Sequence, residues 1–282
     1  MKFTVLGSGG CMVIPKPLCY CRVCEEARVK KSPYERTGPS AFLHDISMLI
    51  DTPAEICRQL NRSRIDRIKY LIFTHLDPDH TEGFRIVEQA SLDFRSWKAY
   101  PDKQITLVLP ETLMDRIRNI HSAYGSMIDF YIQQGFIRIH SFDQIIQLGS
   151  ILIEALSVPR DDHFAYIYIF KQNNKKLIYA PCDIKPFPID HPEVMDADLL
   201  VIQPGIFETG LKHDFLYPSN HISRTTLYTF EDTLKLANDI RSRQILFVHL
   251  EEYWNRGYDE YVALEKQFDN ISFASDNMHL II

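Results

Sequence analysis

Four side chains that commonly bind metals stand within six positions of one another, directly after an apolar run. Residues 70–73 read Tyr-Leu-Ile-Phe and predict a buried strand. The residues that follow include His75, Asp77, Asp79 and His80. Imidazole nitrogens and carboxylate oxygens are ligands that first-row transition metals accept. Residues 81–88 predict a helix, so the four side chains lie on a strand-to-helix loop, where a rigid scaffold commonly holds functional groups.

A simpler interpretation of this segment is a polar loop that caps the next helix. Asp77 or Asp79 could accept hydrogen bonds from the first backbone N–H groups of that helix. Capping accounts for neither His75 nor His80, so we favour a metal site.

The segment resembles the HxHxDH signature of the metallo-β-lactamase-fold hydrolases. It matches the signature at His75, Asp79 and His80 and differs at Asp77, where the family usually has a second histidine. Aspartate can still bind a metal, and as a harder oxygen donor it favours manganese or iron over zinc.

The resemblance implies an α/β fold, a four-layer αββα sandwich of two mixed β-sheets flanked by helices. The order of elements agrees, because the early strands follow one another closely and the later strands are separated by helices. Among these elements we expect a strand over residues 151–155 and a helix over residues 223–240. We expect a single domain over residues 1–282, with a cysteine-rich zinc-binding insertion near residues 11–40.

The resemblance also implies three further ligands at other strand ends. His163 follows a polar cluster before an aromatic strand, although Asp161 or Asp162 could bind in its place. Asp183 ends an apolar strand, in the position of the family's bridging aspartate, and His249 ends another. We expect one metal at His75, Asp77 and His163, a second at Asp79, His80 and His249, and Asp183 between them. The cofactors would be two divalent transition metals, Mn, Zn or Fe.

The resemblance implies catalytic roles for Asp79 and for a histidine before a long helix. His221 occupies that position and would protonate a leaving group or hold a phosphoryl oxygen. His213 is an alternative for the same role.

A second metal site is predicted by three cysteines in the pattern CxCxxC, at Cys19, Cys21 and Cys24. Closely spaced thiolates make closed tetrahedral zinc sites, so we expect one structural zinc. The pattern resembles the branch of the family that contains the phosphoribosyl cyclic phosphate phosphodiesterases and the pyrroloquinoline-quinone biosynthesis proteins B. That resemblance places Glu252 where the phosphodiesterases have a fourth ligand, a histidine; Cys11 or a nearby histidine could serve instead.

Composition restricts the partners. The formal net charge of −6 makes nucleic acid an unlikely partner, because phosphate binding usually leaves a basic surface. No apolar run reaches the length of a membrane span, about 18 residues, and the N-terminus lacks the features of a signal peptide. We therefore expect a cytoplasmic protein with a small-molecule phosphodiester as partner, and a homodimer is possible.

The function that these expectations favour is metal-dependent hydrolysis of a small cyclic phosphate or nucleotide-like phosphodiester through a metal-bridging hydroxide. An alternative is an iron-dependent oxidoreductase that resembles the quinone biosynthesis protein B, since histidines with a carboxylate suit non-haem iron. A catalytically degenerate ligand-binding protein is the non-enzymatic alternative. RNA processing is disfavoured by the acidic charge.

Overall fold

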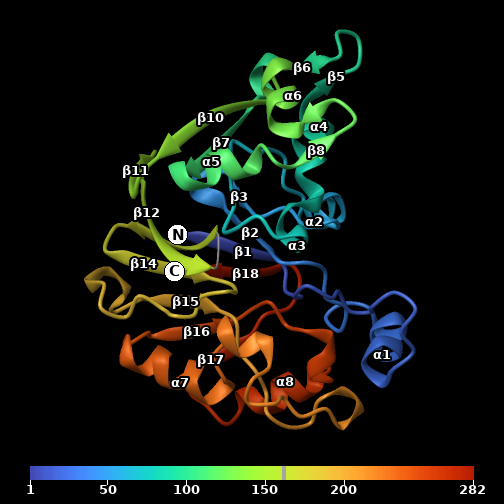
Figure 1. The fold of residues 1–282 in the computed structure, drawn as a ribbon, viewed down its shortest axis with the longest axis vertical. Helices are drawn as coiled ribbons and strands as arrows, with labels where there is room; N and C mark the ends of the chain where they lie inside the picture. The colour runs from blue at the N-terminus through green and yellow to red at the C-terminus, as the bar shows by residue number, and fades with distance from the viewer. Residues whose placement is uncertain (161–162) are drawn as a thin grey trace.

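Two seven-stranded mixed sheets pack against each other in the computed structural model, which describes residues 1–160 and 163–282, with the backbone alone at position 163 (Figure 1). The first sheet has the order β10 (Ile137–Phe142), β7 (Ile105–Pro110), β4 (Tyr70–Ile72), β3 (Met48–Ile50), β2 (Ser40–Leu43), β1 (Lys2–Gly7) and β18 (Met278–Ile281). The second has the order β11 (Ile145–Leu148), β12 (Ile151–Arg160), β13 (His163–Gln172), β14 (Lys175–Ala180), β15 (Leu199–Ile202), β16 (Gln244–Phe247) and β17 (Ile271–Phe273).

Helices flank the two sheets, which confirms the predicted αββα class. The α-helices are α1 (Arg22–Lys30), α2 (Ile56–Ser63), α3 (Pro78–Thr81), α4 (Ile86–Ser91), α5 (Glu111–Ile117), α6 (Met127–Gln133), α7 (Phe230–Asp239) and α8 (Tyr258–Glu265). The 3₁₀ helices are η1 (His44–Ile46), η2 (Glu82–Arg85), η3 (Pro101–Lys103), η4 (Pro192–Val194), η5 (Lys212–Asp214), η6 (Ile222–Thr225) and η7 (Glu252–Trp254). Two small hairpins complete the described elements, β5 (Leu92–Asp93) with β6 (Lys98–Ala99), and β8 (His121–Ser122) with β9 (Gly125–Ser126). None of the described helices is long and apolar enough to cross a membrane.

The two ends of the chain lie side by side in the first sheet (Figure 1). Strand β18 pairs antiparallel with β1, and the backbone N–H group of Ile282 donates to the carbonyl of Met1 at 2.9 Å. The last strand therefore belongs to the sheet built mainly from the first half of the chain.

Side chains of β13 alternate between two apolar layers. Tyr166, Tyr168 and Phe170 face the core between the sheets, and Ile167 and Ile169 face the core under α7 and α8. Successive side chains of a strand point to opposite faces, so a strand buried on both faces is apolar throughout. This is why the apolar runs of the second half of the sequence form central strands.

Parallel strands bring their carboxyl ends to one edge of each sheet. β3, β4 and β7 are parallel neighbours in the first sheet, and β14 to β17 are parallel neighbours in the second. The hydroxyl group of Tyr168 donates to the carbonyl of Phe73 at 2.7 Å, and the N–H group of Tyr166 donates to that of Thr74 at 2.8 Å. These bonds tie the end of β4 to the second sheet, at the position where the candidate ligands begin.

Two local predictions were wrong, and one helix was missed. The strand expected at residues 151–155 continues to Arg160, because its ladder with β13 runs on to the pair Arg160 and His163. The helix expected over residues 223–240 is broken into η6 and α7, and the Thr229 side chain caps α7 by accepting from the backbone of Asp232. The cysteine-rich insertion contains the helix α1, which we did not predict.

Candidate metal centre

His80 is held from its outer side by a buried carboxylate. Its Nδ1 atom lies 2.9 Å from Asp51 Oδ2, and both side chains are fully buried. Asp51 also accepts hydrogen bonds of 2.8 Å from the backbone N–H and the hydroxyl group of Thr74. Because Nδ1 is occupied, the ring of His80 presents Nε2 to the space between the sheets.

His75 and His249 are oriented in the same way. The Nδ1 atom of His75 lies 3.0 Å from the hydroxyl group of Thr74. The Nδ1 atom of His249 lies 3.1 Å from Glu251 Oε1, on a carboxylate that is itself buried. Three imidazoles from two separate loops thus point their Nε2 atoms toward one another. A hydrogen-bonded second nitrogen is the usual arrangement of a histidine that binds a metal.

The inward-facing atoms form three overlapping groups in which all ligand atoms lie within 4.8 Å of one another. The groups are Asp79, His80 and His249; His75, Asp77 and Asp183; and His75, His80 and Cys182. The buried Nε2 atom of His249 lies 3.4 Å from Asp79 Oδ2 but makes no well-formed hydrogen bond with the described residues. A buried nitrogen without a well-formed hydrogen bond is costly unless something binds it. The donor set therefore fits transition-metal ions.

Asp79 lies between two of the histidines. Its Oδ2 atom is 3.4 Å from both His80 Nε2 and His249 Nε2. Burial alone would raise the pKa of this carboxyl group, but its close contacts with the two imidazoles hold the pKa well below its usual range. Asp79 is therefore ionised and available as an oxygen ligand.

Cys182 occupies the middle of the cluster, and the sequence analysis did not select it. Its buried Sγ atom lies 3.4 Å from His80 Nε2 and 3.7 Å from His75 Nε2. Burial opposes ionisation of the thiol, but the surrounding imidazoles, His249 foremost, lower the pKa of Cys182 to about 6. The sequence could have indicated Cys182 through its position directly before Asp183 at the end of β14, because either side chain of that turn could face the site.

Asp183 lies to one side of the cluster rather than between the two halves. Its Oδ2 atom is 3.9 Å from His75 Nε2 and forms an ion pair with Arg160. Asp77 lies on the same side, with Oδ2 at 3.6 Å from His75 Nε2. The expected bridging position is thus nearer to Cys182 than to Asp183. The side chain of His163 lies outside the described residues.

The cysteine pattern converges on Glu252. The Sγ atoms of Cys19, Cys21 and Cys24 lie 3.3, 3.4 and 3.5 Å from Glu252 Oε1, and the four form a group that could hold a metal. Glu252 is buried, and Lys212 forms an ion pair with it. Glu251, the preceding residue, contacts His249, so neighbouring residues face the two candidate sites.

His221 lies at the start of η6, where its Nδ1 atom accepts a hydrogen bond of 3.2 Å from the N–H group of Ser223. A backbone donor at Nδ1 assigns the ring proton of the neutral imidazole to Nε2. The edge of the ring packs against Tyr217, with the ring centroids 4.8 Å apart. His213 is exposed and lines the same cavity as His221.

The β-lactamase superfamily domain model matches residues 47–250, most of the chain. The chain belongs to the β-lactamase superfamily. This confirms the family predicted from the HxHxDH-like segment. A comparison with curated proteins finds no significant match.

Solved structures resemble this superfamily member over its full length. A diphosphatase of the PhnP family is 21% identical, with all of this chain and 97% of that chain covered and a TM-score of 0.73. Zn²⁺-bound PqqB from Methylobacterium extorquens is 16% identical, with both chains fully covered and a TM-score of 0.76. The short form of human tRNase Z is 14% identical, with all of this chain and 99% of that chain covered and a TM-score of 0.65. At these identities the likeness establishes the fold, which is that of metal-dependent hydrolases and their relatives.

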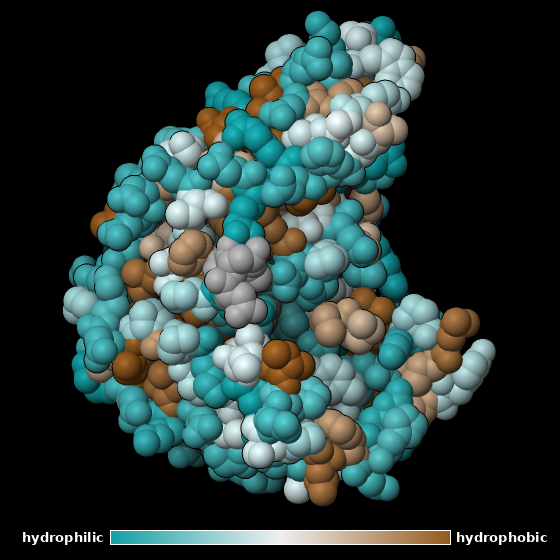
Figure 2. Space-filling view, viewed as in Figure 1, coloured by the Kyte–Doolittle hydropathy of each residue, from teal (hydrophilic) through white to brown (hydrophobic). Residues whose placement is uncertain are grey.

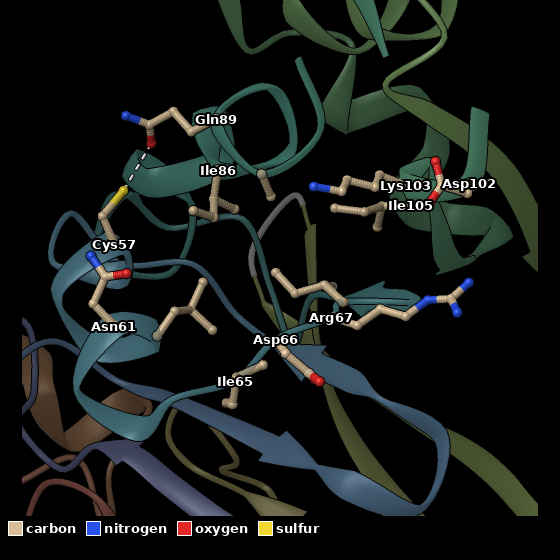
Figure 3. Close-up of a pocket in the computed structure, with 13 residues that line it drawn as sticks. Cys57, Asn61, Ile65, Asp66, Arg67, Ile86, Gln89, Asp102, Lys103 and Ile105 are labelled. Carbon is tan, nitrogen blue, oxygen red and sulfur yellow. Dashed lines mark hydrogen bonds between the residues drawn. The ribbon is translucent and has the colours of Figure 1, made fainter. Parts of the chain in front are cut away.

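Another cavity of this superfamily member lies away from the candidate ligands. It has a volume of about 640 Å³ and is lined by residues that precede β4 and β7, including Asp66, Arg67 and Lys103 (Figure 3). Its thiol, on Cys57, donates to Gln89 Oε1 at 2.8 Å. The candidate ligands follow the carboxyl end of β4, so this cavity lies at the opposite end of the strand. Ligands of α/β folds bind at the carboxyl ends, so we place the chemistry at the metal centre.

Proposed function

We propose that the protein is a binuclear metal-dependent hydrolase of a small phosphodiester, either a cyclic phosphate or a nucleotide-like ester. The observation that carries the proposal is the convergence of three histidine Nε2 atoms on the ionised Asp79 and on Cys182. The fold shared with a PhnP-family diphosphatase and with a tRNase Z supports phosphoryl chemistry.

In the proposed centre, Asp79, His80 and His249 hold one metal. His75, Asp77 and Asp183 hold the other, together with His163, and Cys182 stands between the two sets. Metal ions bound there supply an activated water nucleophile near neutral pH and offset charge on phosphoryl oxygens.

The residues of the chain itself orient this chemistry. Asp51, Thr74 and Glu251 fix the three imidazoles from behind, so that their inward nitrogens are already aligned before a substrate arrives. We propose that His221 donates a hydrogen bond from Nε2 to a phosphoryl or leaving oxygen. The hydrogen bond at its Nδ1 atom favours this role over that of a strong acid.

We propose a small molecule as the substrate. The chain carries a formal net charge of −6, and a polyanionic nucleic acid would be repelled by such a surface unless a basic patch offset it.

The test is hydrolysis of bis(p-nitrophenyl) phosphate by the metal-loaded protein and by Asp79→Ala. We expect the wild type to release p-nitrophenol and the variant to lose nearly all turnover, because Asp79 lies between two candidate ligands. Asp239→Ala, at the exposed end of α7, is the matched control and should keep full activity. Urea unfolding of all three proteins separates lost chemistry from lost folding. An Asp79→Ala protein that keeps most of its activity rules out this centre.

A further inference from the structure

Two cavities flank the turn that carries His221, and they differ in chemistry. One has a volume of about 560 Å³ and is lined in part by Phe215, Tyr217, Tyr253 and Lys16; we call it the aromatic pocket. The other has a volume of about 300 Å³ and is lined in part by Arg160, Lys185, Thr225 and Thr226; we call it the basic pocket. Ser223 lines both.

The aromatic pocket is lined by His221, the residue that we propose as a donor to the substrate, and by Tyr253. Tyr253 lies two positions after Glu251, whose carboxylate is 3.1 Å from His249 Nδ1. The edges of Phe215 and Tyr217 meet with their ring centroids 5.1 Å apart, and Tyr217 also packs against His221. Phe215 is 42% exposed, so a planar ligand can reach its ring.

The basic pocket is connected to the His75 side of the centre. Arg160 pairs with Asp183, and Asp183 lies 3.9 Å from His75 Nε2. The Nζ atom of Lys185 donates to the carbonyl of Arg224 at 2.9 Å, and Lys185, Thr225 and Thr226 line the same cavity. Two cations with hydroxyl donors recognise phosphate oxygens.

We propose that the two pockets together form a subsite for a nucleotide-like substrate, with the base in the aromatic pocket and a further phosphate in the basic pocket. The proposal rests on the proposed function and deepens it, because it selects nucleotide-like esters over sugar-only cyclic phosphates. A ring bound among aromatic side chains gains stacking energy, and a cavity of this size falls in the range of small-molecule sites. On the face shown in Figure 2, polar and apolar side chains intermingle around hollowed regions of the surface.

Calorimetry on the metal-loaded protein measures the affinities for ADP, AMP and ribose 5-phosphate. The comparison of AMP with ribose 5-phosphate gives the contribution of the base, and the comparison of ADP with AMP gives that of the second phosphate. We expect AMP to bind about tenfold more tightly than ribose 5-phosphate, as stacking of one base predicts, and ADP to bind more tightly than AMP. Ribose 5-phosphate that binds as well as AMP overturns the proposal, since binding would then depend on the metals alone.

Two variants test which part of the ligand each pocket binds. Phe215→Leu should reduce the advantage of AMP over ribose 5-phosphate, and Lys185→Gln should reduce that of ADP over AMP. Phe94→Leu and Lys98→Gln, exposed near the β5–β6 hairpin, are the matched controls and should change neither ratio. Unchanged ratios in Phe215→Leu and Lys185→Gln overturn the assignment. If Phe215→Leu does not fold, the NMR signals of AMP are measured in the presence of the wild type. Broadening of the adenine proton signals that exceeds that of the ribose proton signals shows that the protein contacts the base.

AMP and ribose 5-phosphate contain no phosphodiester bond, and chromatography of the titrated samples shows whether ADP has been cleaved, so the readout is separate from hydrolysis of a diester. A wild type that binds AMP as expected but does not cleave bis(p-nitrophenyl) phosphate retains the subsite and rejects the proposed function. If the wild type cleaves the diester but binds AMP no more tightly than ribose 5-phosphate, the subsite is wrong and the proposed function is not affected.

Discussion

The Nδ1 atom of His80 and the carboxylate of Asp51 are 2.9 Å apart, and neither side chain is exposed to solvent. Asp51 directly follows β3, and His80 is on α3 after β4, so the contact joins the ends of two neighbouring parallel strands. A buried carboxylate of this kind fixes the ring of a metal-binding histidine and increases its basicity. Asp51 therefore acts on the metal centre through His80.

Asp51→Asn should weaken metal binding at the centre by about 10–100-fold, the usual effect of removing such a partner. Competition with a chromophoric chelator measures the affinity. Asp239→Asn serves as the control because Asp239 is exposed and lies at the far end of α7. Equal affinities of Asp51→Asn and the wild type would show that Asp51 does not act on metal binding through His80.

Cys182→Ser should remove a thiolate-to-metal absorption band from the cobalt-substituted protein. Sulfur ligands produce intense near-ultraviolet bands with Co²⁺, and imidazole or carboxylate ligands do not. The CxCxxC group contributes equally to both proteins, so the difference spectrum reports the thiol that lies 3.4 Å from His80 Nε2.

The control for this spectrum is Cys57→Ser, since Cys57 donates to Gln89 in the cavity remote from the centre. Identical spectra for Cys182→Ser and Cys57→Ser would mean that Cys182 contacts no metal. Asp183, on the same turn, would then be the remaining candidate from β14.

Cys21→Ser should remove one zinc per chain from the three metal ions that we propose for the wild type. If the substitution weakens zinc binding about 100-fold, the free energy of unfolding falls by about 2.7 kcal/mol at saturating zinc, which lowers Tm by roughly 5–11 °C. Element-resolved metal analysis and calorimetry measure both effects. A full metal count in the variant argues against the cysteine site, and oxygen consumption by the iron-loaded protein would favour the oxidoreductase alternative.

His221→Ala should lower kcat by about 100-fold, the scale expected when one hydrogen-bond donor to a transition-state oxygen is lost. His213→Ala is the comparison, because His213 is the alternative candidate for this role and lines the same cavity, but is exposed. Steady-state kinetics at several pH values distinguishes loss of a donor from loss of a titrating acid. If the His213 variant loses more kcat than the His221 variant, His213 is the hydrogen-bond donor and His221 is not.

Much of the architecture was accessible to sequence reasoning because local patterns determine it. The apolar runs that end at Phe73 and Val248 are strands or strand extensions followed by candidate ligands, since a run apolar on both faces can only be buried in the middle of a sheet. The helix α1 was also readable in principle from the pairs Glu25 with Arg28 and Glu26 with Lys30, which lie one turn apart on its surface.

The missed features involve contacts between distant segments. Cys182 and Asp183 are adjacent in the chain, and only the turn after β14 decides that the thiol lies between His75 and His80 while the carboxylate lies beside Arg160. Asp51 and Glu251 escaped notice for the same reason, because a buried carboxylate has no local signature until its histidine partner is known.

The sequence alone determined the family, the fold class and most of the candidate ligands, because each of these can be recognised from short segments in which a ligand follows an apolar strand. Tertiary structure decided which atoms meet: it closed the first sheet with the last strand, set Glu252 against three thiols and selected Cys182 for the middle of the centre. Such choices depend on the packing of one sheet against the other, where a rotation of one residue in a turn exchanges the side chain that enters the site.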